Sequence, residues 1–535
     1  MGVSKGTGTG VAERLMVAML FIVALAIGLR GMASLPPDEH EILVLRTTHE
    51  MHARGDWIVP YFNDEPRLKK PPLSYWLTGL AAYAGGAEGR ILAWHGRLPS
   101  LLAGLAMAAM LLWAGRRFYS ARAALYATGM FVASVGFFTY THDGRPDFLY
   151  AALCAAGWLA GAVGLVEARG AQPRPMVLMW LAFALATLTK GPHIPFMLVV
   201  AMALYCLTRR PAGSLSPRAL RPVLGLALVV MIALPWWLAL HARIDPHAVR
   251  GSQLAGRLLV PRLNHLFNGY YLYRPLQLLL PWVPLAPLAW LVAARERDGA
   301  RPFTVYLAFC AGAVALGLSF GVQQRFFYML PVMPALCLLA GHGLALLEAQ
   351  RPRLATGLCI AQAVLIAAGA GWLFWSQHEA GWLAGVLTLA LLVGALAGRA
   401  LRSRCVAAMA LAVVLAAASF ARYADGPVLW SIARFQRHDL ATATAQAVGA
   451  EQPLFSFALT PVLYIQVTGR AIPEFASVAA LERAMVERRI ERAYVLAPVK
   501  RKHELAQRFE LRELALMPRK ANDRAGLFLI TNRSH

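Results

Sequence analysis

The sequence predicts an α-helical polytopic membrane protein with a small α/β domain at its C-terminal end. Of its 535 residues, 58% are hydrophobic and only 15% are charged, against about 25% charged residues in soluble domains. The mean hydropathy is +0.52. So few charged residues cannot cover a soluble globule of this size, and apolar runs long enough to cross a bilayer recur along the chain.

The charge is strongly basic, because 52 Lys and Arg residues oppose 28 Asp and Glu residues and give a net charge of +24. In a soluble protein this would suggest nucleic acid. The sequence contains no nucleic-acid-binding motif, so we interpret the charge as cytoplasmic arginines and attraction to anionic membrane lipids. The six cysteines lie in or beside apolar runs without a CxxC pair. They predict buried hydrophobic positions rather than disulfides or a zinc site.

Hydropathy predicts about 13 crossings. The first run follows Lys5 and Arg14, and we interpret it as an uncleaved helix rather than a signal peptide because so many spans follow. The predicted spans are 15–34, 98–115, 121–140, 148–166, 175–188, 193–207, 223–240, 275–294, 302–320, 326–347, 354–375, 381–397 and 406–420.

The apolar run 73–87 is short for a helix that crosses a bilayer. Whether it crosses decides on which side of the membrane every later loop lies. If it lies on the outer surface, the short inner loops are repeatedly rich in arginine, as the positive-inside rule requires. We therefore predict a cytoplasmic N-terminus and a C-terminus outside. The inner arginines are 116, 117, 122, 169, 174, 209, 210, 218, 221, 295, 297, 301, 351, 353, 399, 402 and 404.

This topology leaves three large outer regions, namely loops 35–97 and 241–274 and the tail 421–535. We predict a membrane domain over residues 1–420, which includes both loops, and a separate α/β domain over the tail. In that tail, β-like runs at 454–459, 494–497 and 527–530 alternate with helical stretches such as 481–492.

Charged residues near the outer ends of the spans are the candidate functional residues, because a charge at the bilayer centre costs about 2.5–3.5 kcal/mol. Acidic and basic groups on one face predict a site for an anionic headgroup. These residues are Asp38, Glu39, Lys69, Lys70, Asp143, Asp147, Lys190 and Arg325.

Each candidate also has a structural interpretation. By itself, the Asp38-Glu39 pair is more typical of a solvated helix cap than of a functional site. Lys70, which precedes a Pro-Pro pair and an apolar helix with Tyr75, fits a phosphate clamp or an interfacial anchor. Lys190 stands in a tight Thr-Lys-Gly-Pro turn, where a lysine snorkels poorly; functional and structural roles are both open.

The first outer loop also contains four potential ligands for a divalent cation, which stays a possible cofactor. Their spacing matches no closed metal template, so solvated loop residues are the preferred interpretation and no metal site is assigned. These residues are His40, His49, Glu50 and His52.

Several motifs resemble the C-type membrane glycosyltransferases, above all the bacterial lipid A 4-amino-4-deoxy-L-arabinose transferases, which are similar to protein O-mannosyltransferases. The resemblance covers residues 15–347, and it is most specific in the first outer loop. Lys69 departs from it, because that family usually has an acidic residue there. The matching motifs are Asp38-Glu39, Glu50-Met51, Gly55-Asp56-Trp57, Asn63, Lys70-Pro71-Pro72, Tyr75-Trp76, Arg97-Leu98-Pro99-Ser100, Pro146-Asp147-Phe148-Leu149, Thr189-Lys190-Gly191-Pro192 and Tyr328-Met329-Leu330-Pro331.

The resemblance implies an inverting transfer from a polyprenyl-phosphate-linked sugar at the periplasmic face of the bacterial inner membrane, with a lipid or lipid A acceptor. Asp38 would be the catalytic carboxylate, with Glu39 beside it and Asp147 as a second acidic group. The donor phosphate would meet a set of cations and two tyrosine hydroxyls. That set is Lys70, Lys190, Arg325, Tyr75 and Tyr328.

The basic loop 241–274 is the expected acceptor-facing segment, with Arg250, Arg257 and Arg262 as phosphate-binding candidates. A loop that rests on anionic headgroups is the alternative. We expect a monomer and no nucleic-acid partner. Two other functions stay open: protein O-glycosylation, which shares the chemistry, and a transporter or flippase for an anionic lipid. Transporters usually carry ionisable groups near the midplane, often in repeated halves, whereas these charges gather at one face.

Overall fold

The computed structural model describes residues 7–86, 89–167, 173–208, 216–244, 268–296, 300–321, 324–376, 380–424, 432–517 and 525–532. The chain divides into two compact units, each assembled from segments far apart in sequence. The first unit comprises Met1–Met32, Leu68–Gly86 and Trp94–Ala424. The second comprises Ala33–Arg67, Ala87–Ala93 and Asp425–His535. The predicted division kept the whole first outer loop in the membrane domain, whereas here most of that loop belongs with the C-terminal residues.

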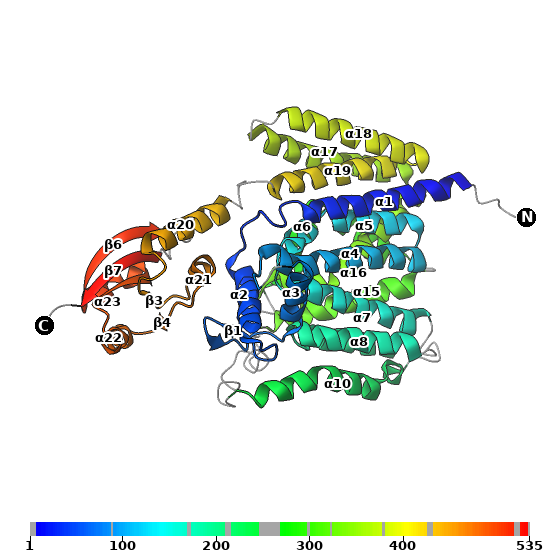
Figure 1. The fold of residues 1–535 in the computed structure, drawn as a ribbon. Helices are drawn as coiled ribbons and strands as arrows, with labels where there is room; N and C mark the ends of the chain where they lie inside the picture. The colour runs from blue at the N-terminus through cyan, green and yellow to red at the C-terminus, as the bar shows by residue number, and fades with distance from the viewer. Residues whose placement is uncertain are drawn as a thin grey trace, which may run out of the picture. The chain divides into compact units, whose positions relative to one another are not determined.

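The first unit is built of helices that run alongside one another (Figure 1). Their bounds are α1 Thr7–Leu29, α3 Leu73–Ala84, α4 Ala93–Phe118, α5 Ala121–Val132, α6 Val135–Thr141, α7 Asp147–Ala162, η1 Val163–Glu167, α8 Pro173–Lys190, α9 His193–Thr208, η3 Pro217–Leu220, α10 Pro222–His241, α13 Tyr270–Tyr273, η5 Arg274–Leu279, α14 Ala286–Ala294, α15 Arg301–Ser319, η6 Phe326–Val332, α16 Met333–Gln350, α17 Pro352–Ser376, α18 Ala380–Ala400 and α19 Arg404–Ala424.

Among the described residues, nine helices are long and apolar enough to cross a membrane, and the bent pair α5 and α6 makes up to ten spans. The chain is therefore a multi-pass membrane protein, as predicted. The predicted number of about 13 crossings is not confirmed. α8 and α9 are not among these nine helices. α9 has only 16 residues. The predicted span 275–294 is divided into the short helices η5 and α14.

The interrupted span and α3 show how local sequence sets helix length. Pro281 and Pro284 lie between η5 and α14, where the missing N–H groups prevent a continuous helix. The indole of Trp282 instead donates a hydrogen bond to the carbonyl oxygen of Ala133, 2.9 Å away. Helix α3 has 12 residues and therefore a length of about 18 Å, too short to cross a bilayer.

Small residues allow the central helices of the first unit to approach closely. A Cβ atom on Gly343 would lie 1.8 Å from the carbonyl oxygen of Ala289, and one on Gly341 would lie 2.5 Å from the carbonyl oxygen of Ala123. Any larger side chain at either glycine would force α16 away from α14 or α5. This packing is typical of helices in membranes, where van der Waals contact drives association.

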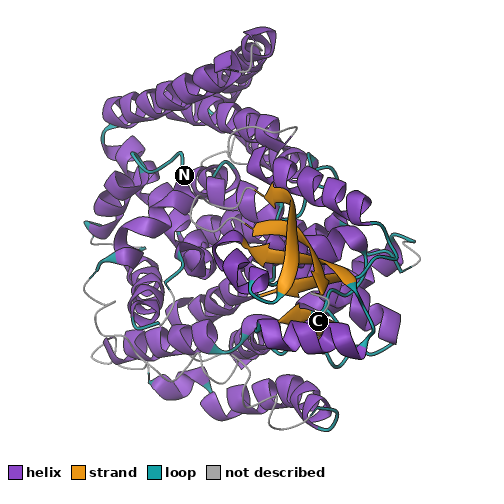
Figure 2. Ribbon diagram, turned by 90° about the vertical axis from the view of Figure 1, so that its left-hand side faces the viewer, coloured by secondary structure: helices purple, strands orange, loops and turns teal. Residues whose placement is uncertain are grey.

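The second unit contains a five-stranded mixed sheet, which is the main β-structure of the chain (Figure 2). The strand order is β4-β3-β5-β7-β6; β3 is parallel to β4 and β5, and β7 is antiparallel to β5 and β6. The bounds are β3 Leu454–Phe457, β4 Glu474–Phe475, β5 Arg492–Pro498, β6 Phe509–Met517 and β7 Ala525–Asn532. The three predicted β-like runs are confirmed as β3, β5 and β7, and the small C-terminal α/β region is confirmed with them.

Helices cover both faces of this sheet. α2 (Glu39–Arg54), α20 (Ile432–Val448) and α21 (Val462–Thr468) contribute to one buried apolar cluster. α22 (Val478–Glu487) and α23 (Lys502–Ala506) contribute to the other. Side chains alternate between the two clusters, as a pleated strand requires. The predicted helix 481–492 is too long at its end, because Arg489 has a φ of 54° and Arg492 begins β5.

Candidate active site

The centre of the candidate site is an ion pair between two helix ends. Asp147 is the first residue of α7, after the Pro146 cap, and Lys190 is the last residue of α8. The Lys190 ammonium group binds the Asp147 carboxylate, and both side chains are 7% exposed. Because an unpaired buried charge is very costly, each residue requires the other. The sequence placed both residues at the same membrane face, and the structure brings them into contact.

The turn after Lys190 is fixed to α7 by Tyr150. The Tyr150 hydroxyl donates to the carbonyl oxygen of Gly191 at 3.0 Å and accepts from the Ile194 N–H at 3.2 Å. Gly191 has a φ of 114°, a conformation that a residue with a side chain rarely adopts. This geometry holds the Lys190 ammonium group over the start of α7.

Aromatic rings enclose the Lys190 ammonium group. Its nitrogen lies 4.6 Å from the centre of the Tyr328 ring and 5.6 Å from the centres of the Phe327 and Tyr150 rings. A cation over ring faces is stabilised by the ring quadrupole. The enclosure also reduces contact with water, so the ammonium charge acts strongly on any anion that approaches it.

A second ion pair extends the first. The Arg145 side chain donates to the Asp143 carboxylate at 2.6 Å and 2.5 Å, and its Nε lies 3.8 Å from Asp147. The same guanidinium lies 5.2 Å from the Phe327 ring centre. The role of Arg145 was missed from the sequence, although the alternation of charge at positions 143, 145 and 147 is visible in it.

Lys70 adds a further positive charge to this group, since its ammonium group acts electrostatically on Asp147. Lys70 is half-buried, whereas Lys69 is exposed. Three cations (Lys70, Arg145 and Lys190) therefore accompany two carboxylates. A group of cations held in place in this way suits an anionic group such as a phosphate.

Helix η6 supplies Tyr328 and begins directly after Arg325. The Trp158 indole donates to the carbonyl oxygen of Pro331 at 3.0 Å, which attaches η6 to α7. The Arg325 backbone N–H donates to the Tyr271 hydroxyl at 3.1 Å, and the Arg325 side chain is exposed. Tyr75 differs from the other predicted residues, because it is fully buried in α3.

The end of α1 is bound to the same region of the first unit by two buried side chains. Arg97 donates to the carbonyl oxygen of Met32 at 2.7 Å. Both ring nitrogens of His142 face carbonyl oxygens at 2.7 Å, those of Phe138 and Arg30.

Asp38 and Glu39 belong to the second unit, at the start of α2. Asp38 is the N-cap, and its Oδ1 accepts from the N–H groups of His40 and Glu41 at 2.8 Å and 2.9 Å. This satisfies donors that the first helical turn leaves unpaired. Glu39 lies 3.9 Å from Arg437 across a half-exposed surface. The helix-cap interpretation therefore holds for Asp38, and its catalytic role stays a prediction.

The possible cation ligands of the first outer loop have other partners. Glu50 accepts from Arg46 at 3.2 Å and from the Asn63 and Asp64 N–H groups at 2.9 Å and 3.1 Å. The His49 ring contacts the carbonyl oxygen of Gly89 at 3.1 Å. Burial, and then the charge of Arg46, lowers the pKa of His49. Within the described ranges, no group of three or more His, Cys, Asp or Glu side chains is arranged to hold a metal ion.

The three arginines predicted to bind the acceptor, Arg250, Arg257 and Arg262, lie outside the described residues. At the ends of the same loop, Arg243 is exposed and the Arg274 guanidinium lies 5.8 Å from the Tyr270 ring centre. The acceptor-binding role of the loop stays a prediction.

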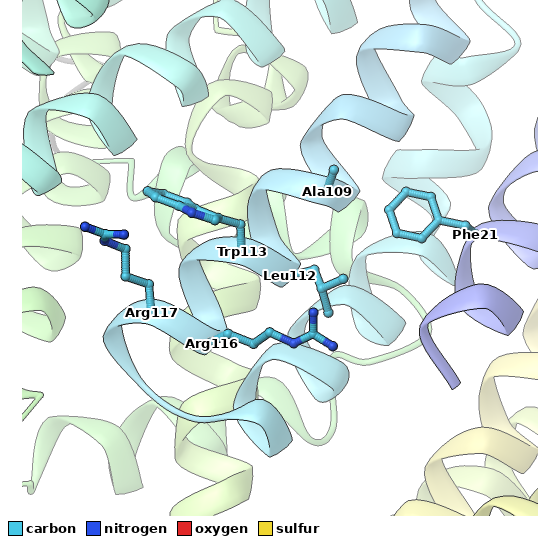
Figure 3. A pocket seen from close by; sticks show the side chains of 6 residues that line it. All are labelled: Phe21, Ala109, Leu112, Trp113, Arg116 and Arg117. Atoms are coloured by element: carbon cyan, nitrogen blue, oxygen red, sulfur yellow. The ribbon is translucent and has the colours of Figure 1, made fainter. Parts of the chain in front are cut away.

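A groove of about 400 Å³ between α1 and α4 is lined by Phe21, Ala109, Leu112, Trp113, Arg116 and Arg117 (Figure 3). Arg116 pairs with Glu13 at 2.7 Å and Arg117 pairs with Glu167 at 2.7 Å. The groove is near the end of α4, far along that helix from Arg97. Both arginines of this groove are paired with a carboxylate, and none of the predicted site residues lines it.

The chain is similar to known proteins in sequence and in fold. The family described as dolichyl-phosphate-mannose-protein mannosyltransferase matches residues 69–238, which include Lys70, Asp147 and Lys190. The crystal structure of ArnT from Cupriavidus metallidurans bound to undecaprenyl phosphate has a TM-score of 0.70 with this chain, at 22% identity over 96% of this chain and 97% of that one. This chain has the ArnT fold. The resemblance predicted from the outer-loop motifs is confirmed.

Two curated relatives are named as arabinosyl transferases. The undecaprenyl phosphate-alpha-4-amino-4-deoxy-L-arabinose arabinosyl transferase of Edwardsiella ictaluri is 28% identical over 282 residues, or 51% of this chain and 48% of the relative. The protein of the same name from Pectobacterium atrosepticum is 25% identical over 337 residues, or 60% of this chain and 57% of the relative. The matches thus span about half the length of these relatives.

Proposed function

We propose that this protein is a membrane glycosyltransferase that takes a sugar from a polyprenyl-phosphate donor. The main support is the group of cations around Lys190, a buried and aromatic-lined ammonium group, which suits a phosphate. Additional support comes from the fold, which is shared with a protein crystallised with undecaprenyl phosphate. The names of the curated relatives favour undecaprenyl phosphate-linked 4-amino-4-deoxy-L-arabinose as the donor.

In the proposed reaction, an acceptor oxygen attacks the anomeric carbon and the bond from that carbon to the phosphate oxygen breaks. Undecaprenyl phosphate leaves with the bonding electrons, and the sugar inverts its configuration. Negative charge develops on the leaving phosphate. Lys70, Lys190 and Arg325 neutralise it, and cations held in advance do so without reorganisation. The hydroxyl groups of Tyr75 and Tyr328 are proposed hydrogen-bond donors to the same phosphate.

Two carboxylates have different proposed roles. Asp38, with Glu39 beside it, acts on the acceptor: it removes the proton of a hydroxyl acceptor or orients a phosphate acceptor that is already ionised. Asp147 holds Lys190 in place, since its carboxylate binds that ammonium group. This assigns Asp147 a role in positioning a cation, in addition to its proposed role as a second acidic group.

The proposed acceptor is the lipid A phosphate at the periplasmic face of the inner membrane, with the N-terminus in the cytoplasm. The loop 241–274, through Arg250, Arg257 and Arg262, is the proposed acceptor-binding segment. A protein acceptor is the second candidate, and the description of the matching family as a protein mannosyltransferase favours it.

The acceptor is tested by mass spectrometry of lipid A and of outer-membrane proteins from a strain that lacks this chain and from the same strain complemented with it. The proposal predicts a sugar-sized mass difference in lipid A that complementation restores. A difference confined to proteins would move the assignment to protein O-glycosylation. Unchanged lipid A together with unchanged proteins would contradict the proposed acceptors of both kinds.

A further inference from the structure

Asn63 joins the first outer loop to the C-terminal residues of the second unit. Its amide nitrogen donates to the carbonyl oxygen of Ile472 at 2.8 Å, and its amide oxygen accepts from the Ile472 N–H at 2.7 Å. The amide nitrogen also lies 3.3 Å from Oε1 of Glu474. Asn63 therefore binds both backbone groups of Ile472, as a neighbouring strand would.

Few side chains other than asparagine satisfy this position. Asn63 has a φ of 60°, in the left-handed region that favours glycine and asparagine. Glycine has no side-chain amide, and aspartate has no donor for the Ile472 carbonyl oxygen. The backbone conformation and the paired hydrogen bonds together account for asparagine here.

The turn that carries Asn63 is attached to α2 through Glu50. One Glu50 oxygen accepts from the Asn63 N–H at 2.9 Å, and the other accepts from the Asp64 N–H at 3.1 Å. Glu50 is 5% exposed, and Arg46 one turn earlier donates to it at 3.2 Å. The turn and α2 are therefore joined by a buried, charge-assisted network.

α2 also packs directly against the C-terminal residues. Ile42 is fully buried and Phe62 is 8% exposed, and both belong to the apolar cluster that contains Ile465 and Leu496. The cap residue of this helix is Asp38. The helix that begins with the proposed catalytic carboxylate is therefore held by Asn63, by Glu50 and by this apolar contact.

We propose that Asn63 is a positioning residue through which the C-terminal residues 432–517 and 525–532 fix α2 and its cap, Asp38. This inference rests on the proposed function. It makes the C-terminal domain a structural requirement for catalysis rather than a separate accessory module.

The test compares Asn63→Gly with Asn532→Ala in the full-length protein reconstituted in proteoliposomes. Glycine permits the left-handed backbone and removes the side-chain amide. Asn532 is the matched control, since it gives one hydrogen bond to the carbonyl oxygen of Ile490 at 3.3 Å in the same unit. We expect Asn63→Gly to lower kcat about ten-fold while the donor KM changes by less than about two-fold. Asn532→Ala keeps the wild-type kcat. Equal loss in both variants, or wild-type kcat in Asn63→Gly, would overturn the proposal.

Hydrogen exchange provides a readout that is independent of activity. The amides of α2 are expected to exchange faster in Asn63→Gly than in the wild type, while the amides of β5 and β7 are unchanged. Unchanged exchange in α2 would overturn the coupling. If wild-type protein transfers no sugar, the proposed function fails, and the exchange experiment still decides whether Asn63 fixes α2.

Discussion

Lys190 and Asp147 form an ion pair in which both side chains are 7% exposed, and each residue lies at the end of its helix. Neither charge is stable there without the other, because breaking a buried pair costs about 3–5 kcal/mol. Tyr150 fixes the turn after Lys190 to α7. The pair therefore has two roles: it closes the contact between α7 and α8, and it holds an ammonium group in the candidate active site.

A double-substitution experiment separates these roles. Asp147→Asn or Lys190→Met alone should lower the free energy of unfolding by about 3 kcal/mol, because one buried charge is left unpaired. The combined variant should recover most of that stability and still transfer no sugar. Thermal unfolding in detergent and a transfer assay measure the two effects. An active combined variant would mean that the pair serves stability alone.

Lys70 and Lys69 form a matched pair of neighbours with different predicted roles. Lys70 acts electrostatically on Asp147, whereas Lys69 is exposed. Lys70→Met should lower kcat/KM for the donor at least about ten-fold, since a cation near the leaving phosphate is lost. Lys69→Met should change kcat/KM by less than about two-fold. Steady-state kinetics with varied donor concentration measures both, and equal losses would show a general charge effect.

Asp38 allows its capping role to be separated from its charge. Asn caps a helix as well as Asp, whereas Ala at the cap costs about 1 kcal/mol. Asp38→Asn should therefore keep the stability of the protein and lose sugar transfer. Asp38→Ala should also lose sugar transfer, and its free energy of unfolding should fall by about 1 kcal/mol. Unfolding and transfer are measured on the same preparations. Full activity in Asp38→Asn would remove Asp38 from the catalytic mechanism.

The pH dependence of stability should include a contribution from His49. Its pKa is lowered in the folded protein, first by burial and then by the charge of Arg46, so the folded state favours the neutral ring. Stability is then fully present above the unfolded pKa of about 6.5, and it falls as the pH drops below that value because the unfolded chain binds more protons. His49→Gln should reduce this fall between pH 7.5 and 5.5, about one unit on either side of that pKa. Unfolding curves of the wild type and of His49→Gln at several pH values would show this difference.

The sequence located those candidate site residues whose position depends on charge alone. Asp147, Lys190 and Lys70 were placed at one face because charged residues avoid the bilayer interior, and the structure brings them together. Arg145 was missed, because its partner depends on how the short turn after α6 folds. No hydropathy pattern indicated that Asn63 would meet Ile472, 409 residues later in the chain.

The fold shows the same limit. The strands at 454–459, 494–497 and 527–530 were predicted because they are short β-like runs between charged helical stretches. β4 and β6 were not, since β4 has two residues and β6 carries charged side chains among its apolar ones. Hydropathy predicted one continuous span at 275–294, whereas prolines divide this apolar run into two short helices.

The most direct test of the proposed function is a reconstituted transfer assay. Purified full-length protein in proteoliposomes receives undecaprenyl phosphate-linked 4-amino-4-deoxy-L-arabinose and lipid A, and both products are followed by mass spectrometry. We predict glycosylated lipid A and released undecaprenyl phosphate in equal amounts, with neither formed by Asp38→Asn. Movement of the donor lipid between leaflets without either product would contradict the transferase assignment and favour a flippase.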